Sequence, residues 1–184
     1  MNRIGASILI LWVMLVLQGC ATPAPYQQMV PQNLPAAAAL KGIALTIAPV
    51  TGGMETKSWD VSRIGNAEFQ QALDETLRQA GASLSANGGN GYALSTEIVS
   101  QNVTGSFSNT ITLLVHYALK NSKGKRIWSE NILSEQELSV KDSFSGSERM
   151  KRLQTSAVQS NLSSLLQKLG QALRADQGKE IPAR

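Results

Sequence analysis

Cysteine, histidine and aromatic residues are scarce in this chain of 184 residues. It contains one cysteine, one histidine and only 5% Phe, Trp and Tyr. A single cysteine excludes a disulfide framework within the chain, and one cysteine with one histidine excludes a metal cluster of the Cys/His type. The spacing of carboxylates typical of a calcium loop is also missing. We therefore expect no metal site.

Sequence motifs of catalysis and of nucleotide binding are missing as well. The chain has no G-x-x-x-x-G-K or G-x-G-x-x-G segment to hold phosphates, and no G-x-S-x-G nucleophile turn. His116 can be a general base, but the favoured interpretation is a polar residue on the outer face of a strand. Glu130, Glu135 and Glu137 are better explained by a solvated strand face than by an inward acid pair. We expect no catalytic residue, no cofactor and no enzymatic activity.

The N-terminus carries a short apolar segment behind one positive charge. Arg3 precedes an almost uninterrupted apolar run from Ile4 to Leu17. As a helix this run is about 21 Å long, which is short for a hydrocarbon core of about 30 Å. Such a length is typical of the apolar region of a secretory signal. The run ends at Leu17-Gln18-Gly19-Cys20.

This ending resembles the lipobox of bacterial lipoproteins. The resemblance implies a signal peptide over residues 1–19, cleavage between Gly19 and Cys20, and a diacylglyceryl group on the Cys20 thiol. Ala21 and Thr22 follow, without the Asp that favours the inner membrane in such lipoproteins. The resemblance therefore implies an outer-membrane anchor with the body of the protein in the periplasm. The alternative is an ordinary membrane anchor in which Cys20 lies beside Gly19 by chance.

Residues 20–40 are predicted to be a lipidated cysteine followed by a spacer. Residues 21–40 contain four of the six prolines and no charged residue. Proline favours extended backbone, so a fully extended spacer would reach about 60 Å. The alanine run at 36–39 can form a helical turn instead. We expect a domain over 41–176 that folds without the spacer, and a flexible tail over 177–184.

The hydrophobic pattern of the remaining chain predicts an α+β fold. Alternation predicts strands over 43–47, 92–98, 111–119 and 126–133, and helical spacing predicts helices over 66–80 and 147–173. The order β-α-β-β-β-α favours a two-layer sandwich, with a mostly antiparallel four-stranded sheet and two helices on one face. Leucines recur along one stripe of the second helix, which we expect to be buried.

This order resembles a group of small periplasmic lipoprotein domains. The group includes the accessory lipoprotein of lipopolysaccharide assembly, activators of peptidoglycan synthases and auxiliary lipoproteins of lipid-transport ABC systems. The resemblance implies a non-enzymatic accessory or assembly subunit that binds a protein partner in cell-envelope biogenesis or transport.

A basic turn offers an alternative function. Lys120, Lys123, Lys125 and Arg126 lie within seven residues around a predicted hairpin turn, and Arg149, Lys151 and Arg152 form a second group. The turn can contact an anionic envelope molecule such as lipopolysaccharide, phospholipid or peptidoglycan, or it can be a solvated turn. We expect no nucleic-acid binding, because the leader directs the chain out of the cytoplasm and the interleaved aromatic residues are missing.

Two loop aromatics are candidates for contact with a protein partner. Phe107 lies in a Gly-interrupted segment over 101–109, and Phe144 lies before the last helix. Exposed aromatic side chains often anchor interfaces. The alternative, that both rings pack back onto the domain, is equally compatible with the sequence.

Overall fold

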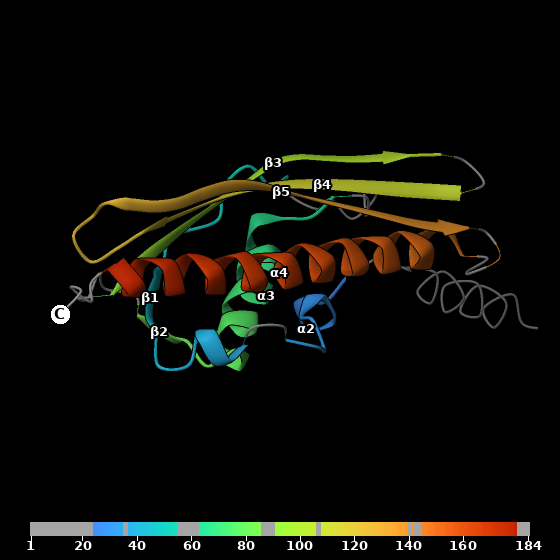
Figure 1. Cartoon of the computed structure of the whole chain (residues 1–184). Coiled ribbons are helices and arrows are strands. Elements are labelled where there is room, and N and C mark those ends of the chain that lie inside the picture. The colour runs from blue at the N-terminus through green and yellow to red at the C-terminus, as the bar shows by residue number, and fades with distance from the viewer. Residues whose placement is uncertain are drawn as a thin grey trace, which may run out of the picture.

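The computed structural model describes residues 24–34, 37–54, 63–85, 91–105, 108–139, 141 and 145–179. Its elements in chain order are α2 (Tyr26–Met29), the 3-10 turn η1 (Ala37–Ala39), β1 (Ala44–Ile47), α3 (Asn66–Gln79), β2 (Ser83–Ser85), β3 (Tyr92–Thr104), β4 (Ser108–Lys120), β5 (Arg126–Ser139) and α4 (Gly146–Lys179). The α+β class predicted from the sequence is confirmed (Figure 1).

The sheet has five strands in the order β2-β1-β3-β4-β5. Strands β3, β4 and β5 form an antiparallel meander, whereas β1 pairs in parallel with both β2 and β3. The prediction of four strands missed β2, because three residues between Ala82 and the next turn are too few for alternation to be recognised. The segment 101–109 is also less of a loop than predicted, since β3 continues to Thr104 and β4 begins at Ser108.

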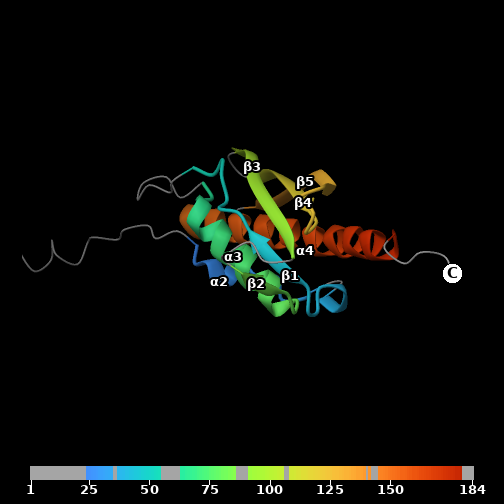
Figure 2. The ribbon, with the colours of Figure 1, turned by 90° about the vertical axis from the view of Figure 1, so that its left-hand side faces the viewer.

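All three α-helices of the described ranges lie on one face of the sheet (Figures 1 and 2). Helix α4 runs along β4 and β5, and α3 contacts β2, α2 and α4. The leucine stripe of α4 is confirmed as part of the core, with no solvent exposure at Leu153, Leu162, Leu165, Leu166, Leu169 and Leu173. Side chains of Leu45, Leu94, Ile111 and Val115 meet it from the sheet.

A polar network crosses this apolar core. The Tyr117 hydroxyl on β4 donates to Asn161 Oδ1 on α4 at 2.7 Å. Asn161 Nδ2 in turn reaches the Ile132 carbonyl and the Ser134 hydroxyl of β5, each at 3.0 Å. Burial raises the pKa of the Tyr117 phenol well above its usual value, so the group stays a neutral donor. Because each member has a partner, the network fixes how α4 sits on the two strands.

The segment over 24–40 differs from the predicted spacer. Helix α2 packs against α3 and α4, and Ala24, Met29, Val30 and Leu40 are buried in the core. The absence of charge from this segment permits it to cover the apolar edge of the helix layer. The domain therefore begins at or before Ala24 rather than at Lys41, and two predicted helices become three.

The C-terminal boundary also shifts slightly. Helix α4 continues to Lys179, so the helix includes the first three residues of the predicted tail, and residues 180–184 lie outside the described part. Over the described ranges, no helix combines the length and the apolar character needed to cross a membrane. Helix α4 is long, but it is amphipathic.

Candidate functional site

The basic hairpin is the turn between β4 and β5, defined here as residues 120–126. Asn121 Oδ1 accepts hydrogen bonds from the backbone amides of Lys123 and Lys125, both at 3.1 Å. Gly124 closes the turn with a φ of 75°, a conformation that suits glycine. All four predicted cations, Lys120, Lys123, Lys125 and Arg126, are exposed on this turn. The structure thus presents all four cations on one turn, which Asn121 holds through hydrogen bonds to the backbone.

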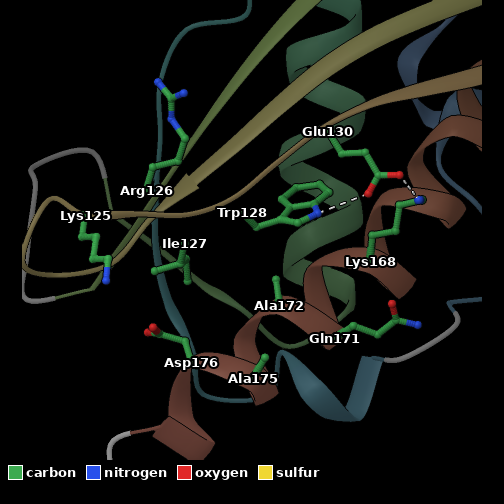
Figure 3. Close-up of a pocket in the computed structure, with 10 residues that line it drawn as sticks. All are labelled: Lys125, Arg126, Ile127, Trp128, Glu130, Lys168, Gln171, Ala172, Ala175 and Asp176. Atoms are coloured by element: carbon green, nitrogen blue, oxygen red, sulfur yellow. Dashed lines mark hydrogen bonds and ion pairs between the residues drawn. The ribbon is translucent and has the colours of Figure 1, made fainter.

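A groove of about 460 Å³ lies between this hairpin and the C-terminal half of α4 (Figure 3). Only two of the four predicted cations, Lys125 and Arg126, line it. The other lining residues come from β5 and α4, namely Ile127, Trp128, Glu130, Lys168, Gln171, Ala172, Ala175 and Asp176. The alternating pattern of β5 and the helical pattern of α4 are both visible in the sequence, but the groove exists only where the two elements meet.

Trp128 forms one wall of the groove. Its ring stacks near-parallel on the buried Tyr117 ring, with centroids 6.5 Å apart and planes 18° from parallel. Its indole Nε1 donates to Glu130 Oε2 at 3.3 Å. The indole is therefore held in place from both sides, and its half-buried surface offers the groove a rigid apolar contact.

Each of the two carboxylates that line the groove has a partner. Glu130 forms an ion pair with Lys168 of α4, and Asp176 accepts a hydrogen bond from the Tyr92 hydroxyl at 3.3 Å. The Lys168 hydrogen bond holds the pKa of Glu130 below its ordinary value. Burial of the carboxyl opposes this shift, and the Trp128 hydrogen bond adds a smaller lowering. An ionised carboxylate of this kind accepts hydrogen bonds and is a poor proton donor near neutral pH.

We expect Lys168→Met to raise the pKa of Glu130 towards its ordinary value. Because the folded-state pKa of Glu130 is depressed, its pairing stabilises the native state above the ordinary Glu range. This contribution is lost as the pH falls through the depressed value. NMR titration of the Glu130 side-chain carboxyl in both proteins measures the shift. An identical titration midpoint in the variant would show that Lys168 does not set the pKa.

In the second basic group, Arg149 and Lys151 each contact a residue of the domain. Arg149 is only 8% exposed and its Nε donates to the buried Asn109 Oδ1 at 2.8 Å. Lys151 lies 3.6 Å from Glu148 in the first turns of α4. These contacts give Arg149 and Lys151 structural partners at the point where the helix begins.

His116 lies on the outer face of the sheet, as predicted. Its Nδ1 lies 2.7 Å from Asn131 Oδ1 and its Nε2 lies 3.1 Å from the Ser129 hydroxyl. A Ser–His–Asn chain has the connectivity of a nucleophile, a base and an orienting group. The four grooves described for this domain are lined by none of these three side chains, which lie on a strand face. The geometry thus supports cross-strand hydrogen bonding between β4 and β5.

The same outer face carries a small apolar patch, defined here as Val99, Leu114 and Leu133. Leu114 and Leu133 are cross-strand partners, and Val99 lies at the bulge that precedes the Leu114 partner on β3. Val99 is 49% exposed and Leu133 is 61% exposed. No sequence prediction singled out this patch, because an isolated Val or Leu in an alternating strand is assigned to either face only when the register is known.

Several predicted site residues lie outside the described part of the chain. These are Gly19 and Cys20 of the leader and the two loop aromatics Phe107 and Phe144. Among the residues that the structure does describe, no three His, Cys, Asp or Glu side chains are grouped as a metal site would require.

Comparison with solved structures reveals the same fold at low sequence identity. The protein XCC0632 from Xanthomonas campestris, of family model DUF330, matches 81% of this chain and 94% of its own length, with 10% identity and a TM-score of 0.59. The hypothetical protein CT253 from Chlamydia trachomatis matches 73% of this chain and 99% of its own, with 15% identity and a TM-score of 0.54. Both likenesses show the fold alone.

A minor lipoprotein from Acinetobacter baumannii is less similar. It matches 69% of this chain and 91% of its own length, with 12% identity and a TM-score of 0.47. No family model matches the sequence, and no curated protein matches it significantly.

Proposed function

We propose that this protein is a non-enzymatic lipoprotein, anchored in the outer membrane through Cys20, that binds a protein partner as an accessory subunit in cell-envelope biogenesis or transport. The leader ending in Gly19-Cys20 supports the anchor and the location. Intact-mass measurement of the membrane-extracted protein tests this part, with a chain that begins at Cys20 and carries acyl mass as the expected result.

The unpaired edge of β5 supports the proposal that the protein binds a protein partner. This strand is 14 residues long and lies at the edge of the sheet, where no other strand of the described chain pairs with its outer side. Long unpaired edges are templates for pairing with another chain, and charged side chains on such an edge limit unselective pairing. The exposed Glu135 and Glu137 supply such charges, while Leu133 supplies an apolar contact.

We expect Leu133→Asp to abolish binding of the partner without changing the melting temperature. At 61% exposure the leucine contributes little to the core, so its replacement costs under about 0.5 kcal/mol. A photo-crosslinking residue at position 133 should give one defined envelope protein by mass spectrometry. A photo-crosslinking residue in place of Gln167, which is exposed on α4, should not give this crosslinked protein.

Leu133→Ile is the matched control, because it keeps the apolar contact and should keep the crosslinked partner. If the Asp variant retains the same partner at the same yield, β5 is not the contact and the proposal fails for this surface.

Binding of an anionic envelope molecule is the second candidate function. Lys125 and Arg126 line the groove at its hairpin end, and Trp128 lines it further along β5 (Figure 3). Phosphates of lipopolysaccharide or phospholipid, or carboxylates of peptidoglycan, would meet the cations while the apolar part of the ligand meets the indole. Such a contact would weaken steeply as the salt concentration rises.

We expect the double change Lys123→Glu and Lys125→Glu to leave the melting temperature nearly unchanged, because exposed charges usually matter by under about 0.5 kcal/mol. If the turn binds anions, low-salt binding to phosphatidylglycerol vesicles is lost. The control is Lys41→Glu with Arg78→Glu, which changes the net charge equally at exposed positions outside the hairpin. Equal binding by both double variants would reject the turn as a specific anion contact.

A further inference from the structure

The distance between the proposed lipid anchor and the folded domain is very short. Ala24 is 1% exposed and belongs to the core, so the domain begins within four residues of Cys20. Four Cα–Cα steps span at most about 14 Å, whatever the conformation of the chain between them. The length predicted for a free spacer over residues 21–40 was about 60 Å. A domain held this closely cannot leave the surface to which Cys20 is attached.

The segment that follows Ala24 is fastened to the domain by specific contacts. The Gln159 side chain on α4 donates to the backbone carbonyl of Gln28 at 2.7 Å and also lies 3.4 Å from the Val30 carbonyl. Met29 is 2% exposed between α3 and α4. Release of this segment to lengthen the tether would expose these apolar side chains and break these hydrogen bonds.

One groove of the N-terminal segment, here called the anchor face, is lined by no charged side chain, whereas the neighbouring groove that shares Pro31 and Gln32 is also lined by Glu75. It is formed by Gln32 and Asn33 from the N-terminal segment, by Gln136 of β5, and by Ser156, Gln159, Ser160 and Ser163 of α4, which together with Pro31 line a groove of about 550 Å³. Without carboxylates, such a face meets no repulsion from anionic headgroups. Its amide and hydroxyl groups retain hydrogen-bond partners in the hydrated headgroup region.

The anchor face lies on the helix side of the sheet and reaches the edge strand β5 at Gln136, whereas the Val99, Leu114 and Leu133 patch lies on the outer face, away from the helices. Figures 1 and 2 both place α2 below α4, with β3, β4 and β5 above α4. A surface that approaches α2 therefore leaves the Val99, Leu114 and Leu133 patch on the far side of the domain.

We propose that the lipid surface of the membrane covers the anchor face and that the short tether fixes this orientation, so the outer face of the sheet points away from the membrane towards a partner. This inference rests on the proposed lipidation of Cys20. It deepens the proposed function, because it states which side of an anchored accessory subunit is available for binding.

Site-specific fluorescence quenching in vesicles tests the orientation. Acylation occupies the Cys20 thiol, so a maleimide fluorophore labels only a new cysteine at Gln32→Cys on the anchor face or Glu135→Cys on the outer face. The acylated full-length mature protein is reconstituted into phosphatidylcholine vesicles that contain headgroup-spin-labelled lipid. We expect quenching at position 32 to exceed that at position 135 by at least threefold. A twenty-residue Gly/Ser insertion between Ala21 and Thr22 should reduce quenching at position 32 to the level at position 135.

Each outcome separates the orientation from the lipidation. Equal quenching at the two positions in the acylated, native-length protein overturns the orientation and leaves the proposed function standing. Strong quenching at position 32 that persists after the insertion overturns the short tether as its cause. An intact mass without acyl chains refutes the lipidation itself, and this inference with it.

Discussion

Removal of residues 24–40 should destabilise the domain by several kcal/mol. Met29, Val30 and Leu40 are buried, and each such side chain contributes about 1.5–3 kcal/mol on burial. The entropy lost when the segment is ordered offsets part of this gain. Since domains of this kind are stable by only about 5–15 kcal/mol, a chain that begins at Lys41 should unfold at a much lower urea concentration than one that begins at Ala24.

The matched control is the chain from Ala24 with Met29→Ala, which keeps the backbone of the segment and removes one buried side chain. This variant should lose about 2–5 kcal/mol if the pocket around Met29 cannot collapse. Equal urea midpoints for the chains from Ala24 and from Lys41 would mean that the segment is the dispensable spacer predicted from its composition.

Leu165→Ala should cost about 2–5 kcal/mol of unfolding free energy. Leu165 is fully buried in the stripe of α4 that packs on β4 and β5, so its truncation leaves a cavity between the two layers. Urea denaturation followed by circular dichroism measures the change, and the slope of the transition should stay that of the parent.

Gln167→Ala serves as the comparison, because this residue is exposed two positions along the same helix. Its replacement by a better helix former should change stability by under about 0.5 kcal/mol. A Leu165→Ala protein that melts like the Gln167→Ala protein would contradict the burial of the stripe.

Local periodicity predicts helix α3 nearly to the residue, whereas the strands are longer than their periodic parts. Helix α3 begins at Asn66, one residue after its N-cap Gly65, because six positions follow a 3.6-residue period, and Gly81, with a φ of 92°, ends it. Strands β3 and β5 extend beyond their predicted ends to Thr104 and Ser139. In these extensions polar residues interrupt the alternation, and pairing with β4 maintains the strands.

The candidate surfaces are less evident from the sequence than the elements. The cations of the hairpin lie within seven residues of one another, so the sequence alone indicates the cluster. The groove, by contrast, joins Trp128 and Glu130 of β5 to Lys168 of α4, about forty residues further along the chain. The patch of Val99, Leu114 and Leu133 requires the register of three strands together with the bulge after Ile98. Local patterns carry no information on such distant pairings.

The sequence by itself determined the α+β class, the amphipathic stripe of α4 and the basic turn, because each depends on residues within a few positions of one another. Its leader alone indicates the anchor at Cys20. Only the tertiary structure decided that residues 24–40 belong to the domain. A charge-free, proline-containing segment is compatible both with an extended spacer and with packing. The choice depends on whether an apolar surface stands within reach, and here α3 and α4 provide that surface to Met29 and Val30.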